Sequence, residues 1–129
     1  MIIDDPATLA EVKAAFAAYE TALVTNDVEA LDGFFWRDPR ALRYGAGENL
    51  YGHDAIAAFR ASRPSAGLSR ELERTLIVSF GRDFATASTL FRREGATGKV
   101  GRQTQSWARL PEGWRIVAAH VSIIDDPSK

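Results

Sequence analysis

The sequence contains no cysteine, and it has only one methionine among its 129 residues. The absence of cysteine excludes a disulfide framework, a thiol nucleophile and a cysteine-ligated metal. No stretch approaches the roughly 20 consecutive apolar residues that a membrane helix needs. The first residues, Met1 to Asp5, lack the basic start and apolar run of a secretion signal. We therefore expect a cytoplasmic protein with no membrane partner.

The sequence also lacks any concentration of positive charge. Its net charge is -1 with a pI of about 6.1, and its basic residues are scattered. This excludes a general nucleic-acid or membrane-surface binder. Only Lys13, Lys99 and Lys129 are lysines, so 13 of the 16 basic residues are arginines. Arginine suits bidentate capture of carboxylates, although a GC-rich genome that encodes arginine in place of lysine explains the same bias.

The remaining composition, 46% hydrophobic and 26% charged, is typical of one globular domain, which we place at residues 1–129. Apolar spacing with Asp-Pro and Asn-Asp boundaries predicts helices over about 6–25 and 28–37, and a third from Gly52 to Arg63. A short strand is expected near 41–44, followed by an antiparallel meander of four strands, at 68–80, 84–93, 99–110 and 114–124. Helices followed by such a meander indicate the α+β class.

Two residues of the N-terminal half are candidates for a site. Tyr19 lies on the apolar stripe of the first predicted helix, so its hydroxyl points toward whatever that helix covers. A structural tyrosine bonded to the backbone gives the same pattern. Arg43 interrupts the short strand, where a buried arginine would need a partner. A rim arginine paired with a surface carboxylate remains the alternative.

The third predicted helix and the last two strands supply further candidates. A helical spacing places three basic residues near Phe59, where they could bind an anionic ligand: His53, Arg60 and Arg63. A solvated helix face is the alternative. On the strands, Gln105 and the pair His120 and Ser122 alternate with apolar residues and are expected to line a cavity wall that also carries Ile116 and Ala118. A satisfied core histidine is the alternative for His120. The two histidines lie far apart without a carboxylate cluster, so we expect no metal and no cofactor.

The order of these elements, ending in Gly113-Trp114-Arg115-Ile116-Val117 and His120-Val121-Ser122, resembles the NTF2-like (SnoaL-like) superfamily. The resemblance implies a cone in which three N-terminal helices pack on a strongly bent mixed or antiparallel sheet and enclose a pocket. It also implies a homodimer. Because this superfamily includes enzymes and pure binding proteins, the fold alone does not determine the function.

Shorter stretches are similar to the AtzH-like (DUF3225) family of cyanuric acid catabolic clusters: Tyr19, Leu42-Arg43-Tyr44-Gly45, Leu50 to Ile56 with Phe59 and Arg60, Gly101 to Gln105, and Trp114 to Ser122. This resemblance implies a cofactor-independent, decarboxylating amidohydrolase that converts 1,3-dicarboxyurea or a related ureido acid to allophanate or its equivalent. Tyr19 and Arg43 match its important pair and are the expected catalytic residues.

The chemistry of such a reaction fits these residue types. Arg43 would anchor a carboxylate, and Tyr19 would donate a proton or polarise the urea carbonyl. His53, Phe59, Arg60, Arg63, Gln105, His120 and Ser122 are the expected substrate-binding residues. Two other functions stay open at this point. One is a noncatalytic small-anion binder or accessory protein of a neighbouring amidase, and the other is a SnoaL-like isomerase or cyclase.

Overall fold

The computed structural model describes residues 1–128. The chain forms three helices and six strands: α1 (Pro6–Val24), α2 (Val28–Phe34), β1 (Leu42–Tyr44), β2 (Asn49–Tyr51), α3 (His53–Ser62), β3 (Arg70–Phe80), β4 (Phe84–Arg93), β5 (Lys99–Leu110) and β6 (Gly113–Asp125). The strands make one mixed sheet in the order β2-β1-β6-β5-β4-β3, in which β1 runs parallel to β6 and the other pairs are antiparallel. This confirms the predicted α+β class.

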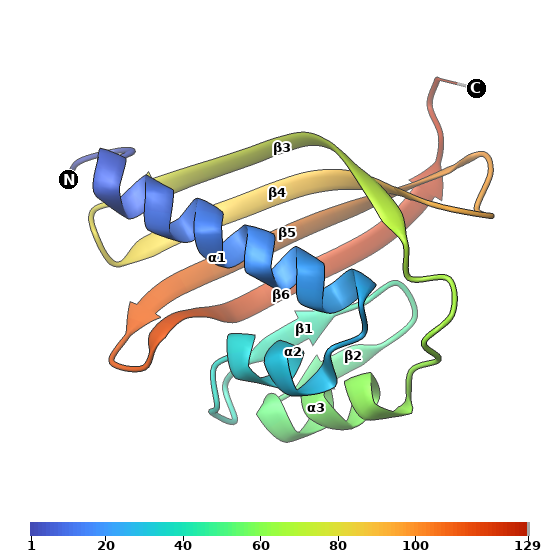
Figure 1. Cartoon of the computed structure of the whole chain (residues 1–129), viewed down its shortest axis with the longest axis horizontal. Coiled ribbons are helices and arrows are strands. Elements are labelled where there is room, and N and C mark those ends of the chain that lie inside the picture. The colour runs from blue at the N-terminus through green and yellow to red at the C-terminus, as the bar shows by residue number, and fades with distance from the viewer. Residues whose placement is uncertain (129) are drawn as a thin grey trace.

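All three helices cover the same face of the sheet (Figure 1). The long α1 crosses the meander, while α2 and α3 lie at the end formed by β1 and β2. The core between the layers contains Val12 and Phe16 of α1, Ile56 of α3, and Trp107 and Ile116 of the sheet. Side chains of this sheet face therefore meet those of α1 and α3 in the interior.

Local signals explain where α1 begins and which side it buries. The Asp5 side chain accepts a hydrogen bond from the Thr8 backbone N–H at 3.1 Å, and Pro6 occupies the first helical position. The apolar stripe, which includes Val12, Phe16 and Tyr19, is buried as predicted. Because one turn separates each of these residues from the next, Tyr19 points at the sheet.

A bulge in β6 overturns one predicted face. Ser106 pairs with Ala118 but its neighbour Trp107 pairs with Ile116, so Val117 is an extra residue in β6. The alternation therefore reverses there: Ile116 is buried toward the helices, whereas His120 is exposed. The expectation that His120 and Ser122 line the same wall as Ile116 is wrong, because a single extra residue moves every following side chain to the other face.

The structure also contains a strand that was not predicted from the sequence. Strand β2 pairs antiparallel with β1, and the two are joined by a tight loop in which the Gly45 N–H bonds to the Glu48 carbonyl at 2.9 Å. This β1–β2 hairpin places Glu48 beside Arg43 of β1. Within residues 1–128, no helix combines the length and the apolar character needed to cross a membrane.

Candidate active site

Tyr19 lies at the centre of the interface between the helices and the sheet. Its side chain is 2% exposed, and its ring makes edge-on contacts with Phe34, Phe35 and Trp107 at centroid distances of 5.9 to 6.4 Å. These aromatic neighbours fix the ring and hold its hydroxyl in one position. The hydroxyl oxygen accepts a hydrogen bond from Nη2 of Arg60 at 2.6 Å.

Arg60 of α3 is the most unusual residue of this interior. It is only 1% exposed, yet its Nε and Nη1 atoms have no hydrogen-bond partner among residues 1–128. The ion pairs in that part of the chain do not include it. A buried guanidinium without a carboxylate is costly and is rarely kept for stability alone. Its Nε and Nη1 atoms therefore remain available as hydrogen-bond donors.

Arg43 lies next to this pair at the end of the interior formed by β1. Its guanidinium carbon is 5.2 Å from the centroid of the Phe59 ring, and its Nη1 donates to Oε1 of Glu48 at 2.9 Å. Burial, followed by the positive charge of Arg60, lowers the pKa of Arg43, while Tyr19 and Glu48 oppose this. The side chains of Arg43 and Glu48 are 9% and 27% exposed, so solvent reaches the site at this pair.

Arg63 completes a group that we call the arginine cluster, composed of Arg43, Arg60 and Arg63. It follows the last residue of α3, and its Nη2 lies 3.3 Å from the Asn26 side-chain oxygen while its buried Nε lacks a partner in residues 1–128. Burial, and next the charge of Arg60, lower the pKa of Arg63 to about 10. The cluster therefore combines three mutually repelling cations, of which Arg43 forms an ion pair with Glu48.

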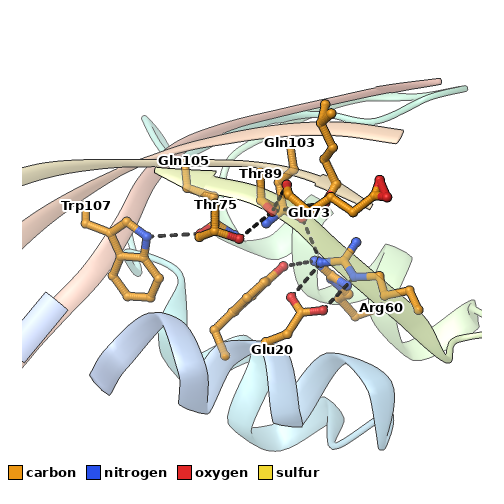
Figure 2. A network of polar contacts seen from close by, with 11 residues as sticks. Glu20, Arg60, Glu73, Thr75, Thr89, Gln103, Gln105 and Trp107 are labelled. Atoms are coloured by element: carbon orange, nitrogen blue, oxygen red, sulfur yellow. Dashed lines mark hydrogen bonds and ion pairs between the residues drawn. The ribbon is translucent and has the colours of Figure 1, made fainter. Parts of the chain in front are cut away.

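The sheet face that is turned toward the helices carries two buried amide side chains. Gln105 is buried and its Oε1 accepts from the Trp107 indole N–H at 3.0 Å, as Figure 2 shows. Two residues earlier, the buried Nε2 of Gln103 has no partner among the described residues. The wall opposite the helices thus offers neutral hydrogen-bonding groups.

A family model for AtzH-like proteins matches residues 1–127. The chain belongs to the AtzH-like family. It is 57% identical to a protein of unknown function of the DUF3225 family from Pectobacterium atrosepticum, with a TM-score of 0.93 and 95% of each chain covered. A cystatin-like fold protein from Burkholderia xenovorans is 50% identical, with a TM-score of 0.94, 98% of this chain and 99% of that chain covered.

More distant structures share the fold alone. An NTF2-like protein from Pseudomonas putida is 19% identical, with a TM-score of 0.76 and coverage of 90% of this chain and 86% of that one. A comparison with curated proteins gives no match. The NTF2-like architecture expected from the sequence is confirmed.

An ion pair between α1 and β3 holds the segment of this AtzH-like chain that carries Tyr19. Arg70 of β3 donates from Nε and Nη2 to the two oxygens of Glu20, both at 2.6 Å, and also to Oε1 of Gln103 at 3.0 Å. Glu20 directly follows Tyr19 on α1, and Figure 2 shows its carboxylate beneath the sheet. The pair therefore ties the helix segment that carries Tyr19 to the strand wall that carries Gln103.

Glu20→Ala is expected to lower the free energy of unfolding by about 3 kcal/mol, because it leaves the Arg70 side chain, 2% exposed, without a carboxylate. Urea denaturation followed by tryptophan fluorescence measures the loss. Glu29→Ala, on the exposed side of α2, is the control and should change stability by less than about 0.5 kcal/mol. Equal losses in the two variants would contradict the structural role of this pair.

Arg60→Met is expected to raise the free energy of unfolding by about 1 to 2 kcal/mol in buffer without carboxylates. The change removes a buried charge that lacks a carboxylate partner and keeps a side chain of similar length. Arg37→Met, at an exposed position, serves as the control for the loss of one cation. A loss of stability in Arg60→Met would show that the guanidinium holds the fold together rather than serving a ligand.

The other predicted site residues take different places. Arg63 belongs to the arginine cluster, and the Phe59 ring packs against the guanidinium of Arg43. Gln105 is buried on the sheet face that is turned toward the helices. His53 begins α3, and its Nε2 lies 2.8 Å from the Asp32 carbonyl oxygen, to which it donates, so it joins α3 to α2. His120 packs edge-on against the Tyr44 ring on the outer sheet face, where the Ser122 hydroxyl accepts from Nε of Arg102 at 3.1 Å.

Two polar residues of the site were not predicted from the sequence. Glu48 was missed because β2 was missed, although the glycines at 45 and 47 signalled a turn. Gln103 was seen only as part of an alternating strand, and nothing in its local sequence distinguishes its partnerless amide nitrogen. In residues 1–128, no group of three His, Asp or Glu side chains is arranged to hold a metal ion.

Proposed function

We propose that this chain is a cofactor-independent enzyme that removes one carboxylate from an N-carboxylated urea such as 1,3-dicarboxyurea, which yields allophanate and CO2. The observation that carries this proposal is the buried contact between the Tyr19 hydroxyl and Nη2 of Arg60, beside Arg43. The resemblance of the sequence to the AtzH-like family supports the choice of this substrate class, and the three side chains are suited to the chemistry.

The direction of the hydrogen bond at Tyr19 makes this residue a proton donor. Because the guanidinium of Arg60 has no acceptor atom, the phenol oxygen accepts in this contact, and its own proton remains available. When the C–N bond to the carboxylate breaks, its electron pair goes to the urea nitrogen and CO2 leaves. That nitrogen then takes the Tyr19 proton. The guanidinium 2.6 Å away stabilises the negative charge left on the phenol oxygen.

Arg43 holds the carboxylate that stays on the product. The carboxylate that leaves becomes neutral CO2, so a cation bound to it would stabilise the substrate more than the transition state. A fork-shaped guanidinium at the solvent-reached end of the site is suited to the retained carboxylate instead. This arrangement turns the reacting end of the substrate toward Tyr19.

Arg60 acts on the urea carbonyl. Its buried Nε and Nη1 donors lack partners among the described residues and have fixed positions in an environment with little water. Donors of this kind stabilise oxygen charge that develops as electrons move through the urea. The amide of Gln103 is a further donor on the opposite wall. We place Arg63 at the entrance, where it attracts the dianion.

Product analysis tests the proposal. The wild-type chain and freshly generated, carboxyl-labelled 1,3-dicarboxyurea are followed by 13C NMR, with a heat-inactivated sample as the control for spontaneous decay. One CO2 and one allophanate per substrate are expected. Formation of urea with two CO2 would show that the second carboxylate is not protected by Arg43. Decay of the substrate at the rate of the heat-inactivated control would contradict the proposed enzymatic activity.

A further inference from the structure

The carboxylate of Glu48 takes a position on Arg43 like that of a substrate carboxylate. Its Oε1 lies 2.9 Å from Nη1 of Arg43 at the edge of the arginine cluster. Among residues 1–128, its other oxygen, Oε2, accepts only from the backbone N–H of the adjacent Gly47, at 3.2 Å. Glu48 therefore contributes a negative charge to the cluster, and its side chain makes few other hydrogen bonds.

Arg43 does not depend on Glu48 for its position. Strand β1 lies between β2 and β6, so the Arg43 backbone is held from both sides. Its guanidinium also packs over the Phe59 ring of α3. Glu48, in contrast, lies at the end of the hairpin loop, with a side chain three times as exposed as that of Arg43. Of the two partners, Glu48 is therefore the one that can move away.

Gly45 provides the space in which the Glu48 carboxylate lies. A Cβ atom at this position would overlap Oε1 of Glu48 and would lie 2.8 Å from Nη1 of Arg43. The contact between Glu48 and Arg43 therefore requires a residue without a side chain at position 45. The backbone at Gly45 does not have a positive φ, so the need for glycine comes from this close approach and not from backbone strain.

We propose that Glu48 is an internal competitor for the carboxylate subsite on Arg43, and that a substrate carboxylate binds there by displacing it. The proposal rests on the proposed function in one respect, the role of Arg43 as carboxylate anchor. Displacement turns the Glu48 side chain outward into solvent, which already reaches it, so the exchanged carboxylate becomes hydrated. The affinity of the subsite for anions is lowered by the fraction of time that Glu48 occupies it.

Calorimetric titration with malonate, a dicarboxylate without a C–N bond, tests this competition without any turnover. Glu48→Gln is expected to bind malonate about tenfold more tightly than the wild type, as for a subsite that Glu48 holds about nine-tenths of the time. Glu29→Gln, which removes the same charge from the exposed face of α2, should change the dissociation constant less than twofold. If Glu48→Gln does not fold, Glu48→Ala replaces it, because it removes the competing carboxylate and leaves the space beside Gly45 open.

If Glu48 competes for Arg43, the tighter binding of malonate by Glu48→Gln must depend on Arg43. The double variant Arg43→Gln, Glu48→Gln is therefore expected to lose it. Malonate binding that is unchanged or weaker in Glu48→Gln would overturn the proposal and make Glu48 a residue that positions Arg43. A gain that survives in the double variant would also overturn it, because the anion would then bind elsewhere. These results are independent of CO2 release, so a failure of the proposed reaction remains distinguishable from a failure of this competition.

Discussion

Arg43→Ala is expected to reduce kcat/KM for 1,3-dicarboxyurea by about a thousandfold while the fold is kept. The variant loses the bidentate partner of the retained carboxylate, and such a buried, charged contact contributes about 2 to 5 kcal/mol. A thousandfold change corresponds to about 4 kcal/mol at 1.36 kcal/mol per factor of ten. Glu48, which the variant leaves without its cation, is accessible to water, so the cost to stability remains small. Initial rates of CO2 release measure the effect.

Two further variants test whether the guanidinium of Arg43 is responsible for this loss. Arg40→Ala removes an exposed arginine three residues earlier, paired with Asp38, and should retain wild-type turnover. Arg43→Lys keeps the charge but not the fork, so we expect an intermediate loss. Circular dichroism establishes that each variant is folded. Full activity in a folded Arg43→Ala variant would show that the anchor has been assigned to the wrong residue.

Tyr19→Phe is expected to lower kcat by about a hundredfold and to leave KM within about threefold of the wild-type value. The phenyl ring retains the contacts with Phe34, Phe35 and Trp107, so substrate binding should change little. The proton donor is lost, and general acid catalysis of this kind is worth about 10² to 10⁴ in rate. A loss in kcat without a change in KM distinguishes a role in the chemical step from a role in binding.

Tyr44→Phe is the matched control for Tyr19→Phe. Its hydroxyl lies 3.2 Å from that of Tyr51 in an exposed position on the outer face of the sheet, and its loss should leave kcat unchanged. A Tyr19→Phe variant that turns over at the wild-type rate would exclude the phenol from proton transfer. A variant that fails only in KM would make Tyr19 a binding residue.

Much of the fold could be predicted because its signals are local. The Asp5 cap with Pro6 sets the start of α1, and period-two runs between glycine turns gave β4 and β5 with the observed bounds. Hydrophobic period and turn chemistry act over a few residues, so a single sequence contains them. Strands β1 and β2, in contrast, have three residues each, too few to show a period, and only β1 was predicted.

The site could be predicted only in part, since its contacts join distant segments. Tyr19 and Arg43 were singled out individually, but the partner of Tyr19 is 41 residues away on α3. The β6 bulge at Val117 depends on pairing with β5 and is invisible in the alternation itself, so the faces of His120 and Ser122 were wrong. Glu48 could not be assigned to Arg43 because the hairpin that brings them together was not predicted.

The measurement that decides whether this chain is a decarboxylating enzyme is the initial rate of CO2 release from freshly generated 1,3-dicarboxyurea, with the spontaneous rate subtracted. The wild-type chain is expected to release CO2 well above the spontaneous rate and in proportion to protein concentration, and an equal amount of folded Tyr19→Phe is expected to release about a hundredfold less. Release by the wild type at the spontaneous rate would contradict the claim that Tyr19, Arg43 and Arg60 form the active site of a decarboxylating enzyme.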